Sequence, residues 1–381
     1  METEQKSPTR DRLGIHLVWE IALFLCAAGL LFALTRSGVG PFSETGWSGF
    51  AAALLPLLLG TAGMALSLRV STVNLAIGPI ALFSGWLFVD ASASGTVLAI
   101  GMALGAAFFL GLTSALLNAW LRIPGWATSI GIGGSLILLS RSEPGVFHLD
   151  ALGNNIVYLA LGATVVFTLG LATIGAFAGI RARLEANRET PDGQWRPHPW
   201  LLGSGIIASF LLAGAAGVVF SWSGSNAETA TLINPWELSL MALGAALLGG
   251  TSVYGRRGGF AGTFLGAVVV LSSMWFLEDR GWFNPLWIPV GAIVFGFVLT
   301  RVVEVWNSAE DSDDEVAERA GDIDDLKADA TTILPGGNSG EETKPTSMPT
   351  SADPVQDNDF AAMANGTGVF DQMPGEETNR R

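Results

Sequence analysis

Apolar residues along this chain gather into ten long runs that are separated by short polar stretches. The runs occupy residues 17–35, 48–68, 74–89, 96–118, 126–140, 155–180, 200–221, 237–250, 260–277 and 286–305. A bilayer core requires roughly 20 apolar residues per helix, and fewer where a helix is broken or buried among others. The pattern therefore predicts an all-α, polytopic membrane protein of about ten transmembrane helices.

Basic residues near the ends of these runs set the predicted orientation. If the N-terminus lies in the cytoplasm, ten crossings place only Arg36, Arg141 and Arg280 outside. The remaining basic residues before position 307 fall inside, as the positive-inside rule requires: Lys6, Arg10, Arg12, Arg69, Arg122, Arg181, Arg183, Arg188, Arg196, Arg256, Arg257 and Arg301. We therefore expect a multi-pass protein of the cytoplasmic (inner) membrane, embedded in the lipid bilayer, with both termini in the cytoplasm.

The composition of the chain changes after Trp306. Of the 34 acidic residues, 18 follow it and only five basic residues oppose them, so this segment carries 18 minus 5, or 13, of the 14 net negative charges. Such a polar segment buries too little apolar surface to offset the entropy cost of ordering it. The predicted organisation is a cytoplasmic N-terminal segment (1–16), a transmembrane domain (17–306) and a disordered acidic cytoplasmic tail (307–381).

Small residues recur within the runs at spacings that allow helices to approach closely, and we expect them to pack within the chain. They are Gly101, Gly105, Gly131, Gly133, Gly134, Gly262 and Gly266. The single cysteine, Cys26, is expected in the packed core. Most of the 13 Trp residues, Trp19 among them, lie near run ends, where anchoring at the membrane interface is their default role.

Enzymatic chemistry finds little support in the residues present. The lysines and histidines are few and scattered: Lys6, Lys327, Lys344, His16, His148 and His198. No lysine lies between residues 7 and 326, which excludes ATP hydrolysis by a P-loop within the membrane domain. Within the predicted runs, no two His, Cys or carboxylate residues are three or four positions apart on one helix face, so we expect no metal site, no cofactor and no catalytic residue. The body before residue 307 is nearly neutral, and we expect no nucleic-acid partner.

Ionisable residues are scarce within the runs. Glu20 lies one helical turn from the predicted cytoplasmic edge, and the others are predicted at run ends: Arg69, Arg122, Glu237, Arg301 and Glu304. Proton- and sodium-coupled carriers usually keep such groups inside the membrane. Energy for uphill transport is therefore expected to come from another subunit.

Residues 71–86 have the sequence STVNLAIGPIALFSGW. A polar residue and a glycine at the start of a membrane segment allow a broken helix, whose freed backbone groups face protein or a cavity. Asn74 and Gly78 are therefore candidates for a broken helix or a translocation path, and a helix N-cap is the alternative role for Asn74. Asn74, Leu75 and Gly78 match the pattern G-I-D-L-S-V-G-S, so the segment resembles the permeases of ABC importers for ribose, xylose and galactose, whose superfamily includes branched-chain amino acid permeases.

Two further segments resemble the same family. Residues 121–131, LRIPGWATSIG, are similar to L-R-[IV]-P-P-F-[IV]-x-T-L-G, with Gly125 in place of the second proline and Trp126 in place of the phenylalanine. Residues 246–270, ALLGGTSVYGRRGGFAGTFLGAVVV, are similar to I-G-G-T-S-L-x-G-G-x-G-x-x-x-G-T-x-x-G-A. Glycines at these positions favour a tight cytoplasmic turn between closely packed helices. The residues of this predicted packing turn are Gly249, Gly250, Thr251, Ser252, Gly258, Gly262 and Gly266.

The resemblance covers most of residues 50–305 and implies a non-catalytic translocation subunit for a small neutral solute, most simply a sugar. It implies three protein partners: a cytoplasmic ABC ATPase subunit, a second permease copy or paralogue, and an extracytoplasmic solute-binding protein. Candidate contacts to the ATPase are the basic residues of the two cytoplasmic loops, Arg181, Arg183, Arg188, Arg256 and Arg257.

One segment departs from the family. Residues 181–199, RARLEANRETPDGQWRPHP, lack the pattern A-x-G-x-N-x-x-A-A-x-x-x-G-I that the family carries there. This departure favours an alternative function, a permease-derived membrane scaffold or regulatory protein without transport activity. An ion-coupled carrier and an intramembrane enzyme are further alternatives.

Overall fold

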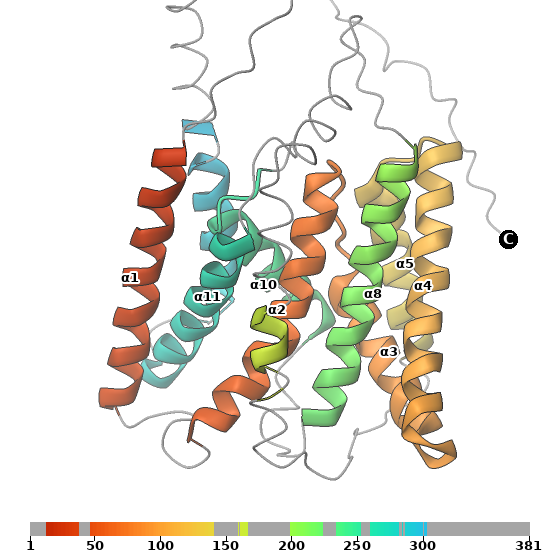
Figure 1. Cartoon of the computed structure of the whole chain (residues 1–381), viewed down its shortest axis with the longest axis horizontal. Coiled ribbons are helices and arrows are strands. Elements are labelled where there is room, and N and C mark those ends of the chain that lie inside the picture. Colours follow the sequence, from red (N-terminus) through yellow and green to blue (C-terminus); the bar gives the residue numbers. More distant parts are fainter. Residues whose placement is uncertain are drawn as a thin grey trace, which may run out of the picture. The chain divides into compact units, whose positions relative to one another are not determined.

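The computed structural model describes residues 13–37, 46–140, 159, 161–166, 199–223, 234–252, 260–281, 284, 286–299 and 301–302. All regular structure within these residues is helical (Figure 1). The helices are α1 (Leu13–Ser37), α2 (Gly46–Arg69), α3 (Ile77–Ala91), the 3-10 turn η2 (Ser92–Ser94), α4 (Thr96–Trp120), α5 (Gly125–Ser140), α8 (Pro199–Ser223), α10 (Pro235–Leu248), α11 (Phe260–Arg280) and a further helix at Trp287–Leu299.

Five of the described helical segments are long and apolar enough to cross a membrane: Val18–Ser37, Gly49–Arg69, Ile77–Ser94, Thr96–Trp120 and Pro199–Ser221. Four more apolar helices are shorter, namely Gly125–Leu139, Pro235–Leu248, Ala261–Leu277 and Trp287–Leu299. The described chain is thus all-helical with five candidate membrane-spanning helices. Most of the predicted run 155–180 and all of the predicted tail 307–381 lie outside the described residues.

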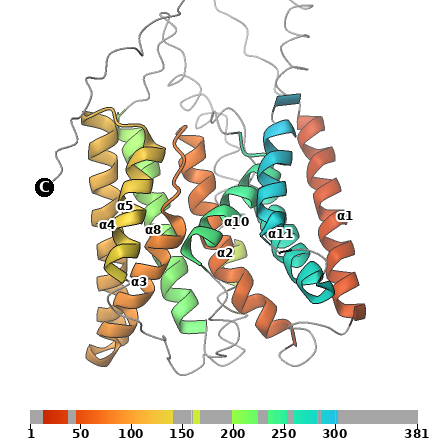
Figure 2. The same cartoon turned by 180° about the vertical axis from the view of Figure 1, so that it is seen from behind.

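Helix α8 lies at the centre of the packing, against α2, α3 and α4, while α10 packs against α11, α2 and α3. Helices α2 and α8 run antiparallel, because Gly63 lies beside Leu212 and Val70 beside Gly205. If α2, α3 and α4 are taken to correspond to α8, α10 and α11, the contacts of one half recur in the other. The pair α3 and α4 corresponds to α10 and α11, the pair α3 and α8 to α10 and α2, and the pair α4 and α8 to α11 and α2. The two halves of the described bundle, seen from both sides in Figures 1 and 2, therefore have the contact pattern of an inverted repeat.

Small residues explain how closely α8 approaches its neighbours. A Cβ atom on Gly217 would overlap the carbonyl oxygen of Ala81 in α3, and one on Gly214 would lie 2.6 Å from the Cβ of Ala107 in α4. The predicted packing role of Gly101 and Gly105 is wrong for the described residues. No atom lies within 4 Å of a Cβ at either position, because they occupy the outward side of α4 and the buried side is formed by alanines.

The same test separates the glycines of α5. Gly131 and Gly134 have no neighbour within 4 Å, whereas a Cβ on Gly133 would lie 3.2 Å from Pro79. Among the described residues, Gly133 alone of these three has the close contact that the sequence predicted for the whole cluster.

Helix α1 packs against α11, and Trp19 also connects it to α10. The indole Nε1 of Trp19 donates a hydrogen bond of 2.9 Å to the carbonyl oxygen of Leu248, and its ring stacks on Phe295. Trp19 thus holds α1 to the C-terminal end of α10, a contact that the predicted interfacial anchoring does not include. Cys26 is exposed on α1, so the prediction that it lies in the core is wrong.

One buried hydroxyl gives a stability prediction. The Ser272 Oγ is buried and has no hydrogen-bond partner among the described residues. An unsatisfied buried polar group costs about 1–3 kcal/mol, so Ser272→Ala is expected to leave the thermal unfolding midpoint in detergent unchanged or to raise it. The matched control is Ser209→Ala, another fully buried serine, whose hydroxyl accepts a hydrogen bond from Asn74. A lower midpoint for Ser272→Ala than for Ser209→Ala would contradict the assignment.

Candidate functional site

The chain between α2 and α3 is a break in the helical structure. Helix α2 ends in a tight turn in which Ser71 has a φ of 56° and its N–H donates to the carbonyl oxygen of Leu68. The Thr72 backbone N–H and hydroxyl both donate to the carbonyl oxygen of Ser67. After this turn the chain runs back beside α2 in Figure 1 before α3 begins. The broken helix predicted around residues 74–78 is therefore located before Ile77.

Asn74 holds the extended segment to α8. Its Nδ2 donates to the Ser209 hydroxyl at 2.9 Å, and its Oδ1 accepts from the Ala76 N–H at 3.1 Å. The N-cap position of α3 is occupied by Ala76, which makes no side-chain cap bond, so Asn74 is not the N-cap residue. Its amide instead satisfies backbone freed by the break, at a position that is 4% exposed.

Ser129 of α5 supports the same segment. Its hydroxyl accepts from the Leu75 N–H at 3.1 Å, and its one hydrogen has two acceptors within reach, the carbonyl oxygens of Val73 at 3.2 Å and of Trp126 at 2.9 Å. These hydrogen bonds replace those that a continuous helix would make, as irregular backbone inside an apolar bundle requires.

Helices α3 and α10 begin at one buried point. The Ser239 hydroxyl accepts from the Gly78 N–H at 2.9 Å and donates to the Leu75 carbonyl oxygen at 2.8 Å. Gly78 faces the carbonyl oxygen of Pro235, the first residue of α10, and a Cβ there would overlap that oxygen. The N-termini of the two short helices are therefore joined by one serine and one close backbone contact.

This junction lies at mid-depth of the longer helices. Ile77 packs against Gly60 and Gly63, which lie in the middle of the span Gly49–Arg69. Ser209, the partner of Asn74, is likewise central in the span Pro199–Ser221. The junction thus lies about halfway along both spans.

Glu237 consequently lies at mid-depth as well, because it is in the first turn of α10. The sequence predicted Glu237 at the end of an apolar run, and Glu237 does lie in the first turn of α10, but this end of the helix lies beside the middle of α2 and not at an end of the bundle. The apolar run at 237–250 does begin there, but it begins inside the bundle. The acidic side chain is partly buried within the chain.

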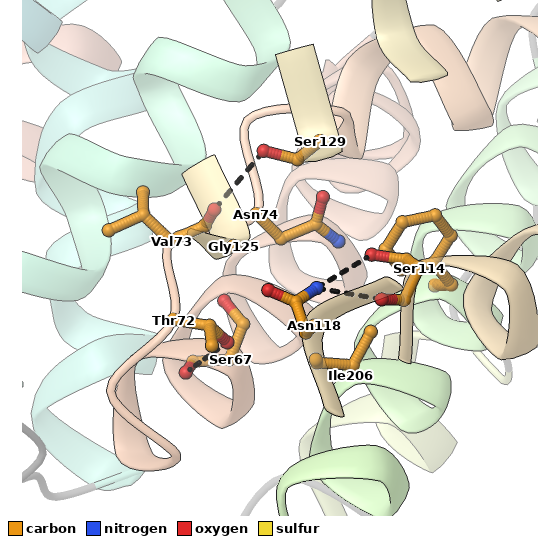
Figure 3. A pocket seen from close by; sticks show the side chains of 10 residues that line it. Ser67, Thr72, Val73, Asn74, Ser114, Asn118, Gly125, Ser129 and Ile206 are labelled. Carbon is orange, nitrogen blue, oxygen red and sulfur yellow. Dashed lines mark hydrogen bonds between the residues drawn. The ribbon is translucent and has the colours of Figure 1, made fainter. Parts of the chain in front are cut away.

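A small polar cavity adjoins the break, and its lining is drawn in Figure 3. It is formed by Ser67, Thr72, Val73, Asn74, Ser114, Asn118, Gly125, Ser129, Ile206 and Phe210. The Asn118 Nδ2 donates to the Ser114 carbonyl oxygen at 2.7 Å and to the Thr128 hydroxyl at 3.1 Å. In Figure 3 the amide oxygen of Asn118 points the other way, toward Thr72 and Gly125. The cavity has a volume of about 10 Å³, room for about one water molecule and far less than a pocket for a whole ligand.

The predicted packing turn follows α10. A Cβ on Gly249 would lie 2.5 Å from the backbone nitrogen of Thr263, and one on Gly262 would overlap the carbonyl oxygen of Gly249. Gly250 has a φ of 82°, and the hydroxyls of Thr251 and Thr263 are 3.2 Å apart. The structure thus brings together the N-terminal part of the predicted turn and α11.

The rest of the predicted turn is only partly described. Gly266 approaches the carbonyl oxygen of Ala245, and Ser252 is buried. The predicted residues Gly258, Arg256, Arg257, Arg181, Arg183 and Arg188 lie outside the described residues.

The serines that organise the junction were not predicted from the sequence. Ser129, Ser209 and Ser239 are each at most 1% exposed and each lies within an apolar run. A hydroxyl inside such a run is common, so its position in the sequence carries no signal of a long-range partner. The short length of the run 237–250 was the available signal, because 14 residues do not span a bilayer.

The junction yields a second stability prediction. Ser239→Ala removes the hydroxyl that satisfies both Gly78 N–H and the Leu75 carbonyl oxygen, and is expected to destabilise the protein by about 1–3 kcal/mol. Thermal unfolding in detergent measures this. The control is Ser135→Ala, whose exposed hydroxyl bonds only to its own helix at Gly131 and is expected to change stability by less than about 0.5 kcal/mol. Equal midpoints for the two variants would contradict the assigned role of Ser239.

Comparisons of the chain with protein-family models, curated proteins and solved structures found no match. The fold and the site therefore define a class only: an all-helical protein whose five long apolar helices are compatible with a membrane protein and whose buried junction joins the N-termini of α3 and α10.

Proposed function

We propose that this chain is the membrane-spanning translocation subunit of an ATP-binding-cassette importer that moves a small neutral, sugar-like solute across the cytoplasmic membrane. In this proposal the chain crosses the membrane ten times, with both termini and the acidic tail in the cytoplasm. It works with a cytoplasmic ATPase subunit, a second permease copy or paralogue, and an extracytoplasmic solute-binding protein.

The observation that carries the proposal is the meeting of α3 and α10 at mid-depth. Two discontinuous helices in corresponding positions of an inverted repeat are typical of transporters, where such breaks form the solute path. Ser239 and Asn74 satisfy the freed backbone at this point. The three sequence segments that resemble sugar permeases include the break itself and the turn after α10.

The chemistry of the interior supports a neutral solute. Among the described residues, every buried polar side chain is a Ser, Thr or Asn, groups that hydrogen-bond to uncharged molecules. Glu237 differs from these residues because it carries an acidic group and is only partly buried at mid-depth. An ion-coupled carrier would also use such a group, so the test must identify the source of energy.

Purification from native membranes in mild detergent provides that test. We expect an ATPase and a solute-binding protein to co-purify with the chain, and solute uptake to require ATP. Recovery of the chain with neither partner would argue against the proposal and favour the alternative, a permease-derived scaffold or regulator. Uptake driven by a proton or sodium gradient without ATP would point to a carrier.

The basic pair at 256–257 gives a sharper test of the ATPase contact. The double substitution Arg256→Gln with Arg257→Gln is expected to weaken ATPase co-purification and ATP-driven uptake, while the amount of folded protein stays the same. Lys in place of both arginines keeps the positive charges for membrane orientation and is the control. Full ATPase association in the Gln variant would show that the pair serves only as a topology signal.

A further inference from the structure

Glu237 is the charged residue of the described chain that lies farthest from a helix-bundle edge. Helix α10 starts beside Gly78, and α3 starts beside Gly60 and Gly63 in the middle of α2, so the first turn of α10 is at mid-depth. The other charged side chains described lie near the ends of their helices: Glu20, Arg36, Arg69, Asp90, Arg122, Arg280 and Arg301.

The side chain of Glu237 does not belong to the apolar core of the chain. Its neighbours Leu238 and Ser239 are buried, at 5% and 1% exposure, and face α3 and the bundle interior. Glu237 and Leu240, three residues further on, are both partly exposed and lie on another side of α10. Trp236 packs against Gly133 of α5, with its ring 3.3 Å from where a Cβ would be.

A carboxyl group at this depth is costly in lipid and persists where it faces water, a partner group or a transported ligand. Two features of this position suit a carboxyl group at mid-depth. The N-terminal turn of α10 places the positive end of the helix dipole next to Glu237, and the side chain is not fully enclosed by protein.

We propose that Glu237 lines a water-filled path through the membrane domain and accepts hydrogen bonds from hydroxyl groups of the transported solute. Carboxyl oxygens accept hydrogen bonds, so this side chain suits ligands that donate them. This inference rests on the proposed transport function for the identity of its ligand, whereas the accessibility of the site to water does not depend on any ATPase.

The test uses the full chain with Cys26 replaced by alanine and a cysteine introduced at Leu240, so that Glu237 stays intact. Right-side-out and inside-out membrane vesicles are treated with the charged, membrane-impermeant reagent sulfonatoethyl methanethiosulfonate. We expect Leu240→Cys to be modified from at least one side. The control is Phe109→Cys, at the middle of α4 and 66% exposed on its outward side, which is expected to face lipid and to stay unmodified.

The ligand is tested with ribose, xylose and galactose as the added probes. At least one of these sugars is expected to slow modification of Leu240→Cys. When Glu237→Gln is added to this variant, the sugar concentration that halves the modification rate is expected to rise about tenfold, as loss of a hydrogen bond to the sugar predicts. Asp at position 237 keeps the carboxylate and should retain part of the protection. Glu20→Gln, near the end of α1, is the matched charge-removal control and should retain all of it.

Three results would overturn the inference. If Leu240→Cys is as unreactive as Phe109→Cys, Glu237 does not face a water-filled path. Protection by sodium chloride but not choline chloride, with none by the sugars, would make the site a cation site. If the sugars protect Leu240→Cys equally well with and without Glu237→Gln, Glu237 does not bind the sugar. Each of these outcomes is separate from co-purification of an ATPase, which tests the proposed function.

Discussion

Replacing Gly78 by alanine is expected to prevent α3 and α10 from packing as they do in the native bundle. The new Cβ would overlap the carbonyl oxygen of Pro235 and lie 2.6 Å from its carbonyl carbon. These are backbone atoms, so no side-chain rotation relieves the overlap. Overpacking typically costs about 1–3 kcal/mol and occasionally more, and we expect the upper end or beyond, because the first turn of α10 must move. The measurement is the yield of monodisperse protein in mild detergent and its thermal unfolding midpoint.

The matched control for this substitution is Gly131→Ala in α5. No atom lies within 4 Å of a Cβ at Gly131, so its effect is expected to stay within about 0.5 kcal/mol. If Gly78→Ala gives the same yield and midpoint as Gly131→Ala, then α3 and α10 do not meet at Gly78. The proposed function would then lose the observation that carries it.

The helices themselves follow from the sequence because a long apolar run in a bilayer has few structural options. Runs 48–68, 96–118 and 200–221 coincide within a few residues with α2, α4 and α8. Asn74 lies in the non-helical segment between α2 and α3, whereas Gly78 is already the second residue of α3.

The depth of the break did not follow from the sequence. Hydropathy measures whether a segment is apolar, and gives no information on whether the segment starts at the membrane surface or inside the bundle. The prediction that Glu237 lies at the end of a run therefore did not reveal that this end lies inside the bundle, where α10 begins beside Gly78. Contacts across long sequence separations, such as Ser239 with Gly78, depend on how the two halves pack. The packing role predicted for the glycines of α4 was wrong among the described residues for the same reason, because residue spacing alone does not show which side of a helix meets a neighbour.

The second large effect is expected at the contact between α10 and α11. A Cβ on Gly249 would lie 2.5 Å from the nitrogen and Cα of Thr263, and a Cβ on Gly262 would overlap the carbonyl oxygen of Gly249. Each glycine therefore meets backbone of the opposite element, and Gly249→Ala or Gly262→Ala must separate the two elements. We expect each to destabilise the protein by about 1–3 kcal/mol or more, seen as a lower unfolding midpoint and a lower folded yield.

The control and the double variant make this prediction specific. Gly291→Ala adds a Cβ with no neighbour within 4 Å and should be close to neutral. Because Gly249 and Gly262 occupy one contact, separation caused by the first substitution removes most of the clash from the second. The double variant is therefore expected to lose clearly less stability than the sum of the two single losses. Additive losses would mean that the two glycines act independently and that the turn is not one packing unit. A loss of folded protein here, with the folded amount kept in the Arg256 and Arg257 variant, would separate the packing role of the turn from its proposed role in binding the ATPase.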